Sequence, residues 1–237
     1  MRIDKLLSSL HYGSRNDIKK MAKDGLIIIN DRKEKDASMD VDPNNDTIII
    51  NGETLFYKEH LYVMMNKPVN VVSTATDSYH ATYLDFLPEP YQRFDLQVCG
   101  RLDVDTTGLL LLTNDGDYLH KVISPKKDVF KTYSVTLDKP IENVEPLTKG
   151  VTIKDGQERP YTTKPAIVYD MNGNFCRIKI SEGKFHQVKR MFEAIGYTVV
   201  QLKREAIGSL NLDESMIEGD VRLLSNEEKE LVFIHED

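Results

Sequence analysis

The sequence predicts an α+β chain with a small first domain at residues 1–58 and a larger second domain at residues 59–237. Two kinds of apolar pattern indicate this class: some segments repeat apolar residues every three to four positions, as helices do, and others carry continuous or alternating apolar runs, as strands do. After a turn-rich connector at residues 51–60, the composition shifts to a buried-strand pattern, which places the boundary between the domains. The 237 residues, 40% of them hydrophobic, are enough for two such cores.

The composition also excludes several classes of protein. No apolar stretch approaches the roughly 20 residues of a membrane span, and the first residues lack the pattern of a signal peptide. The two cysteines, Cys99 and Cys176, form no CxxC pair and have no metal-ligand spacing. We therefore expect a cytoplasmic protein with no disulfide, no bound metal and no membrane partner. The absence of a heptad pattern favours a monomer.

The net charge of −7 conceals two basic segments. Residues 1–23 hold six Lys or Arg against two acids, and residues 177–204 hold seven against two. Residues 205–237 hold ten acids against two bases, a balance of −8 that exceeds the deficit of the whole chain. Because a local basic surface binds phosphates whatever the overall sign, nucleic acid remains a candidate partner.

Two helices and two strands are predicted at the start of the chain. Apolar residues at positions 3, 6, 7 and 10 give the first helix one apolar face, and SRND at residues 14–17 is a capping box for the second, which Gly25 ends. LIII at residues 26–29 and TIII at residues 47–50 are strand-like, with a turn at Asn30-Asp31. Arg15, Lys19 and Lys23 lie four residues apart and form a basic stripe, which is either a solvated helix face or an RNA-binding face.

This arrangement resembles the S4 RNA-binding domain over roughly the first 45–60 residues. The matching elements are RIDKLL at residues 2–7, the Ser14-Arg15 turn and the strand that follows, with Gly13 directly before the serine as a slight departure. The resemblance implies RNA binding through contacts to phosphates, which give affinity without reading sequence. The side chains expected to make them are Arg2, Lys5, Arg15, Lys19 and Lys23.

The middle of the chain carries a polar loop, CGRLDVDTTG at residues 99–108, which runs directly into four leucines. This pattern predicts a tight turn at the end of a buried strand, and TNDG at residues 113–116 ends that strand. Carboxylates at such a position lose water and become chemically useful. In the structural alternative, Asp103 and Asp105 only cap backbone N–H groups. The loop alone does not decide between the two.

A helix at residues 117–123 and a strand at residues 126–137 follow. The strand alternates with period two, so Lys131 and Tyr133 share one face and Thr132 takes the other. The ring of Tyr133 is either a platform for a base or an ordinary cross-strand aromatic.

A further strand at residues 177–180 leads through a turn into a helix whose apolar face includes Val188 and Met191. At 100° per residue, Lys189 lies at the edge of that face, where it either reaches a carboxylate or extends to solvent. Arg190 points nearly opposite, toward solvent or phosphate, and His186 is expected to pack or to cap at the helix start.

Three of these segments together resemble the motifs of the RsuA-type ribosomal RNA pseudouridine synthases: GRLDVDTTGL at residues 100–109, KTY at 131–133 and EGKFHQVKRM at 182–191. MNKP at 65–68 matches the first strand of that family and REAIG at 204–208 its closing segment. The resemblance covers nearly the whole chain, and an S4 domain leads many members. It implies a mixed, largely antiparallel sheet with flanking helices behind the S4 domain.

The resemblance also implies roles for individual residues. Asp103 matches the essential aspartate, Tyr133 the tyrosine that packs on the target uracil, and Lys189 the basic residue paired with the aspartate, which is Arg in sister families. Arg101 matches an arginine that helps to hold the RNA backbone and the base stack from which the target uridine has flipped out. Asp105, Thr106 and Thr107 are expected to shape the loop, and Lys131, Arg190 and Arg204 to bind RNA.

The implied reaction breaks the C1′–N1 bond of a uridine, turns the base and rejoins it through C5. It needs neither a redox cofactor nor an energy source. Asp103 attacks C1′ or removes the 2′ proton, Lys189 directs it, and Tyr133 stacks on the uracil and helps remove the C5 proton. The expected partner is ribosomal RNA, free or in an assembling subunit. An S4 domain on a compact chain without a long basic tail favours the 16S RNA of the small subunit.

Two other functions remain open. Residues 103–106 fit the D-x-D-x-T signature of Mg²⁺-dependent aspartyl-phosphate phosphotransferases, although there the apolar strand precedes the aspartate and here it follows. A non-catalytic S4-type RNA-binding or ribosome-assembly protein is the second alternative, distinguished by whether any uridine is changed.

Overall fold

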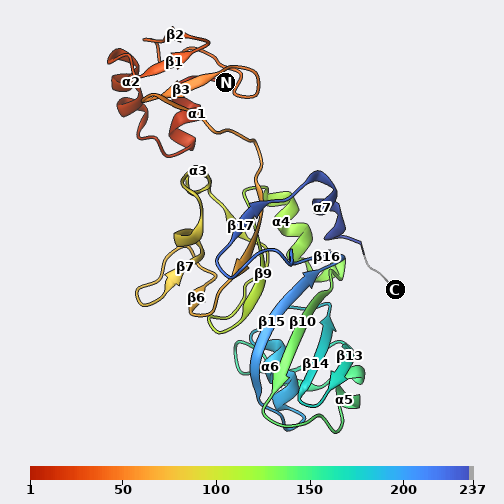
Figure 1. The fold of residues 1–237 in the computed structure, drawn as a ribbon. Coiled ribbons are helices and arrows are strands. Elements are labelled where there is room, and N and C mark those ends of the chain that lie inside the picture. The colour runs from red at the N-terminus through yellow and green to blue at the C-terminus, as the bar shows by residue number, and fades with distance from the viewer. Residues whose placement is uncertain (235–237) are drawn as a thin grey trace. The chain divides into compact units, whose positions relative to one another are not determined.

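The computed structural model describes residues 1–234, and the chain divides into two compact units (Figure 1). The first comprises Met1–Leu61 together with Pro88–Leu96, and the second comprises Tyr62–Leu87 and the chain from Gln97 onward. The sequence predicts a single boundary between residues 58 and 59, and nothing in its pattern indicates that Pro88–Leu96 joins the first unit. No helix among the described residues is long and apolar enough to cross a membrane.

The first unit pairs two helices with a four-stranded antiparallel sheet, of which the apolar patterns predict the two helices and two of the strands. The apolar side chains of the first helix, Leu6 and Leu7 among them, are fully buried. Ser14 and Asp17 form the predicted capping box, in which each side chain accepts a hydrogen bond from the backbone of the other. The elements are α1 (Ile3–Ser9), α2 (Arg15–Lys23), β1 (Ile27–Ile29), β2 (Arg32–Lys33), β3 (Ile48–Ile50) and β4 (Glu53–Thr54), with sheet order β2-β1-β3-β4.

Aromatic packing explains why Pro88–Leu96, with its short helix α3 (Glu89–Gln92), belongs to the first unit. The ring of Phe56 lies 5.6 Å from that of Tyr91 and 5.9 Å from that of Phe94. The guanidinium of Arg93 lies 4.0 Å from the ring centre of Tyr12. These contacts join residues far apart in sequence, and no local periodicity indicates them.

The second unit is built on a nine-stranded mixed sheet with the order β13-β14-β10-β15-β9-β5-β17, to which β16 adds beside β15 and β8 beside β9. In the described chain β15 pairs with β9 in parallel and the other pairings of this sheet are antiparallel, which confirms the predicted sheet. The strands are β5 (Tyr62–Lys67), β8 (Gln97–Val98), β9 (Thr107–Thr113), β10 (Lys131–Leu137), β13 (Ile167–Asn172), β14 (Phe175–Ile180), β15 (Val199–Ile207), β16 (Leu210–Asn211) and β17 (Val221–Leu223).

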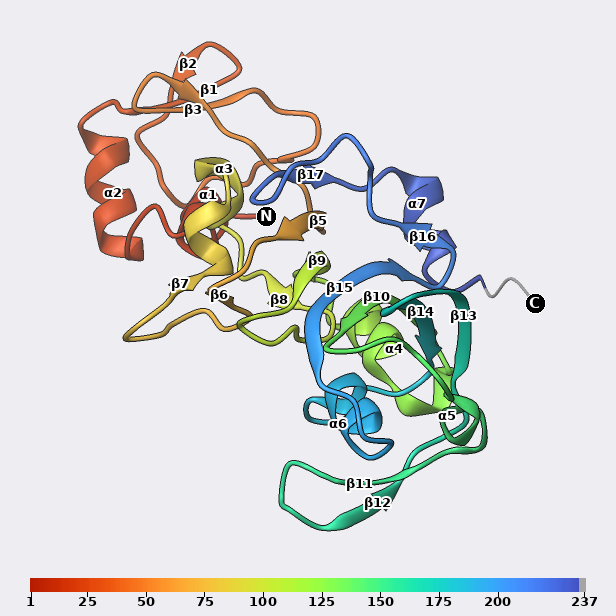
Figure 2. The same cartoon turned by 60° about the horizontal axis from the view of Figure 1, so that its bottom comes forward.

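Helices and two small strand pairs flank this sheet. The hairpin of β11 and β12 projects beyond the end of the sheet, beside α6 (Figure 2). The four leucines of β9 are at most 1% exposed and form part of the core. The remaining elements are β6 (Val71–Val72), β7 (Ala81–Thr82), η1 (Tyr83–Phe86), α4 (Gly116–Ile123), η2 (Pro125–Lys127), α5 (Glu145–Lys149), β11 (Thr152–Lys154), β12 (Pro160–Thr162), α6 (Gln187–Glu193) and α7 (Asn226–Leu231).

The strand predicted at residues 126–137 begins only at Lys131. Pro125 opens a single 3-10 turn, and Asp128 follows in the left-handed conformation with φ of 49°. That conformation interrupts an extended chain, so the alternating pattern before Lys131 forms no strand. From Lys131 onward the predicted strand and its faces are confirmed, since Lys131 and Tyr133 line one cavity and Thr132 lines another.

Candidate active site

A buried arginine holds the polar loop before β9 against β15. Gly108 has φ of 99°, and a Cβ there would collide with the carbonyl oxygen of Arg204, so only glycine permits the approach of the two strands. The guanidinium of Arg204 donates from Nε to the carbonyl of Leu109 (2.7 Å) and from Nη2 to that of Gly100 (3.0 Å). Arg204 is only 2% exposed, so the prediction that it binds RNA phosphates is wrong: its donors are used inside the protein.

A buried lysine lies beneath the same loop. Lys67, at the end of β5, is fully buried, and its Nζ donates to the carbonyls of Thr106 (2.8 Å), Pro68 (2.9 Å) and Val104 (3.4 Å). Burial lowers the pKa of Lys67 to about 8, although the nearby carboxylates of Asp105 and Asp103 favour the charged form. In the sequence Lys67 stands out only as a member of the MNKP motif at residues 65–68, which does not indicate its role under the loop.

The structure brings Asp103 and Lys189 together, as the sequence predicts. Lys189 Nζ, on α6, lies 3.1 Å from Asp103 Oδ2 and 2.5 Å from Asp105 Oδ1. Burial would raise the pKa of Asp105, but the hydrogen bond and charge of Lys189 outweigh it and hold that pKa below its ordinary value. Asp105 is therefore a second partner of the lysine as well as a loop residue.

The histidine at the start of α6 also faces the aspartate. His186 Nε2 lies 3.5 Å from Asp103 Oδ1, and its ring stacks on that of Phe185 with centres 3.8 Å apart. Its side chain makes no capping hydrogen bond, so of the two expected roles packing is confirmed and capping is wrong. His186 precedes α6 in the left-handed conformation, with φ of 50°, so it lies outside the helical repeat and no helical spacing could have indicated its position.

A buried carboxylate fixes the turn that presents this histidine. Glu182 accepts hydrogen bonds from the hydroxyl of Tyr161, from the backbone N–H of Lys164 (2.8 Å) and from Nε2 of Gln187 (3.0 Å). Gln187 in turn accepts a hydrogen bond from the N–H of Lys184 (2.8 Å). Because every one of these polar groups has a partner, the turn before α6 is held in one geometry.

The paired carboxylate and lysine lie at a cleft of about 960 Å³ in the second unit. This volume suits one nucleotide. Tyr133, which is 8% exposed, contributes to its wall from β10. Of the predicted site residues, six line the cleft: Arg101, Asp103, Lys131, Tyr133, Lys189 and Arg204.

Arg190 does not face solvent, and its predicted contact with RNA is wrong. Its Nη1 donates to the carbonyls of Lys154 (2.5 Å) and Asp155 (2.8 Å), and its Nη2 lies 3.1 Å from Glu158 Oε1. The side of α6 opposite its apolar face is covered by the β11–β12 hairpin, a tertiary contact that helical periodicity cannot show. Arg190 thus fastens the hairpin to the helix that carries Lys189.

The basic side chains of the first unit remain available for the predicted phosphate contacts. Arg15, Lys19 and Lys23 are exposed along α2, and Lys5 is exposed on α1. Arg2 differs, because its guanidinium donates to both carboxylate oxygens of Asp4 (3.1 and 2.8 Å) and is in part neutralised there.

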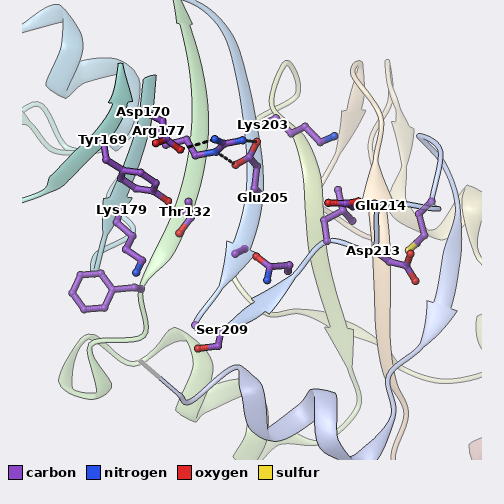
Figure 3. Close-up of a pocket in the computed structure, with 16 residues that line it drawn as sticks. Thr132, Tyr169, Asp170, Arg177, Lys179, Lys203, Glu205, Ser209, Asp213 and Glu214 are labelled. Atoms are coloured by element: carbon purple, nitrogen blue, oxygen red, sulfur yellow. Dashed lines mark hydrogen bonds and ion pairs between the residues drawn. The ribbon is translucent and has the colours of Figure 1, made fainter. Parts of the chain in front are cut away.

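A second cavity, of about 490 Å³, lies on the opposite face of the sheet (Figure 3). Arg177 in this cavity is held between Asp170 and Glu205, each at 2.7 Å. Lys179 also lines it, from the strand next to Lys131 but from the other face. Acidic side chains outnumber basic ones in its lining, and the predicted catalytic residues do not line it.

Cys99 lines the cleft as a buried thiol. Burial raises the pKa of Cys99 to about 12, so this thiol beside the loop stays protonated. Among residues 1–234, no group of three or more His, Cys, Asp or Glu side chains is arranged to hold a metal ion.

Comparison with known proteins agrees with this geometry. The model of the RNA pseudouridylate synthase family matches residues 61–194, and that of the S4 domain matches residues 1–47. The uncharacterized RNA pseudouridine synthase YtzG of Bacillus subtilis (strain 168) is 43% identical over 98% of both chains. Ribosomal small subunit pseudouridine synthase A of Escherichia coli (strain K12) is 37% identical over 96% of this chain and 98% of its own.

A solved crystal structure of a pseudouridylate synthase superimposes with a TM-score of 0.67 and 37% identity, covering 98% of this chain and 99% of that one. The similarity therefore extends through both units and includes the polar loop, the strand of Tyr133 and the helix of Lys189. The resemblance inferred from the sequence motifs is confirmed: the chain belongs to the RNA pseudouridylate synthase family and carries an S4 domain at its amino-terminal end.

Proposed function

We propose that this protein converts one uridine of 16S ribosomal RNA to pseudouridine, acting as a monomer in the cytoplasm. The observation that carries the proposal is the 3.1 Å pair of Asp103 and Lys189 at a cleft large enough for a nucleotide. The name of the Escherichia coli relative supports the small subunit as the source of the substrate. The aspartyl-phosphate alternative is overturned by the family match.

The target base must leave its stack before it can enter the cleft. Extruding a base from folded RNA costs a few kcal/mol, which contacts to the phosphates have to offset. Exposed cations suited to this lie on α2 of the first unit, and Arg101 lies exposed at the cleft of the second. We propose that these groups hold the RNA backbone while the uridine turns inward.

Asp103 then acts as an ionised carboxylate. Lys189 favours that form by its charge and fixes the direction of the oxygens, and His186 lies against the other oxygen. The carboxylate either bonds to C1′ or takes the 2′ proton, and in both routes the electron pair of the C1′–N1 bond leaves with the base. Asp105 keeps Lys189 between two carboxylates and so limits its movement.

Tyr133 holds the detached base in the same cleft. Its ring is almost fully buried in the wall, where an aromatic face stacks on a uracil at little cost in conformational freedom. The base turns and C5 bonds to C1′; this step displaces the carboxylate from C1′ in the first route, and it returns the proton from Asp103 to C2′ in the second. The C5 proton then leaves with the help of Tyr133, and N1 gains a proton. Atoms and charge balance without any further reactant.

The decisive test is a map of pseudouridines in ribosomal RNA from cells that lack this protein. We expect one uridine of the small-subunit RNA to remain unmodified, and its modification to return with the wild-type gene. The variant Asp103→Asn should not restore it, whereas Asp170→Asn, which removes a carboxylate from the opposite face of the sheet, should. An unchanged map would leave the non-catalytic RNA-binding alternative.

A further inference from the structure

Lys131 lines the cleft with no protein partner. It extends from β10 on the face that carries Tyr133, two positions away, so the two Cα atoms are about 7 Å apart at the usual rise of a strand. Within the described part of the chain, the structure gives its ammonium group neither a hydrogen bond nor an ion pair.

Other buried or paired cations that line the cleft or lie beneath its loop differ from Lys131. Lys67 donates to three carbonyls, Lys189 contacts two carboxylates and Arg204 donates to two carbonyls. Burial and the charge of Arg204 together lower the pKa of Lys131 to about 8, against the opposing charge of Asp128. A half-buried cation without a partner is unfavourable, and such groups gather at sites that bind or transform a ligand.

We propose that Lys131 donates a hydrogen bond to a carbonyl oxygen of the flipped uracil and stabilises the negative charge that the base acquires when the C1′–N1 bond breaks. This inference rests on the proposed function and names a further catalytic residue for it. The electron pair of the broken bond passes to N1 and spreads onto O2 and O4. Lys131 keeps its protons throughout. At the sugar, Asp103 compensates the loss of this electron pair either by bonding to C1′ or by taking the 2′ proton.

The symmetry of the reaction suits a single fixed donor. Turning uracil about the axis through N3 and C6 exchanges N1 with C5 and, at the same time, O2 with O4. A donor that contacts one carbonyl before the turn therefore contacts the other carbonyl afterwards. Lys131 can thus stabilise both the departing base and the base that attacks through C5, without moving.

The position of Lys131 favours the base over a phosphate. The base that stacks on Tyr133 lies beside the same strand, where its edge is within reach of a lysine side chain two residues away. Arg101 and Lys184 are exposed members of the cleft lining, and these suit the strongly hydrated phosphates better.

The test uses the full-length protein with 16S RNA transcribed in vitro from either uridine or 5-fluorouridine triphosphate. Fluorine withdraws electrons, so 5-fluorouracil leaves more readily and needs less stabilisation. Because fluorine also replaces the C5 proton, the rate on both RNAs is followed as the disappearance of the N1-linked nucleoside and not as the loss of that proton. For Lys131→Met we expect the single-turnover rate on uridine RNA to fall by about 10²- to 10³-fold, as when one donor to a developing oxyanion is removed. The loss on 5-fluorouridine RNA should be at least about tenfold smaller, with RNA affinity within about threefold of wild type.

Lys179→Met is the matched control, because it removes the same charge from the neighbouring strand on the opposite face. It should leave both rates unchanged. An equal loss on both RNAs for Lys131→Met, a loss of affinity alone as for a phosphate contact, or no loss would each overturn the assignment. If circular dichroism shows that Lys131→Met is unfolded, Lys131→Ala, which also removes the donor and its charge, is subject to the same criteria. A wild-type protein that converts neither RNA would instead refute the proposed function.

Discussion

Replacing Lys67 by methionine tests whether a charged lysine lies buried beneath the catalytic loop. The side chain is fully buried and the three oxygens around it are backbone carbonyls, with carboxylates farther away. Burial lowers the pKa of Lys67 from 10.5 to about 8, a difference that corresponds to about 3 kcal/mol at 1.36 kcal/mol per unit. Methionine has similar length and no charge, so it removes this titration from the folded state.

The sign of the pH dependence of stability follows from the number of protons that Lys67 binds in the folded and unfolded states. Between pH 8 and 10.5 the unfolded chain keeps the proton of Lys67 and the folded chain loses it, so the unfolded state binds more protons and stability rises with pH. The contribution is about 1.4 kcal/mol per pH unit within this window. Below pH 8 both states are protonated and the contribution is constant.

Urea unfolding followed by circular dichroism, for wild type and Lys67→Met at pH 7.5, 8.5 and 9.5, measures this contribution. The free energy of unfolding of the wild type relative to the variant should rise by about 1 to 2 kcal/mol between the lowest and highest pH. Lys179→Met, which removes a lysine from the second cavity, should follow the wild-type trend. A difference between wild type and Lys67→Met that stays constant with pH would refute the reasoning.

Three further perturbations follow from the site. Gly108→Ala places a Cβ against the backbone of β15, so urea unfolding should show a loss of at least about 2 kcal/mol, and a loss below about 0.5 kcal/mol would contradict the close approach. Arg190→Met should leave the salt dependence of RNA binding unchanged, because this arginine contacts the β11–β12 hairpin and no phosphate; a shallower slope of log Kd against log salt would show otherwise. Asp105→Asn should lower kcat by about tenfold through looser placement of Lys189, with KM little changed, and a loss as large as that of Asp103→Asn would make Asp105 the reacting group.

Local pattern predicted most of the elements that position the site. The four leucines after the polar loop became β9, the alternation from Lys131 became β10, and the apolar face with Met191 became α6, because each pattern reflects burial on one face of a regular element. The pair of Asp103 and Lys189 came from the motifs together, since residues 86 positions apart carry no periodic signal that they meet.

The features that the sequence did not predict share one cause, which is contact between segments far apart in the chain. Arginines such as Arg190 and Arg204 commonly bind RNA phosphates. Here their guanidinium groups instead donate to backbone carbonyls of segments that are distant in the sequence. Phe56 draws the segment of Tyr91 into the first unit through ring packing that no spacing in the sequence encodes. Lys67 and Lys131 look alike in the sequence, and only the surroundings show that one is fully partnered and the other is not.

The central claim is that Asp103 carries the reaction, and the release of tritium from 16S RNA labelled at C5 of uridine measures it most directly. Purified Asp103→Asn should release no tritium above background, while its affinity for the same RNA stays within about threefold of wild type. Asp103→Asn that still releases tritium at a rate approaching that of wild type would contradict the account.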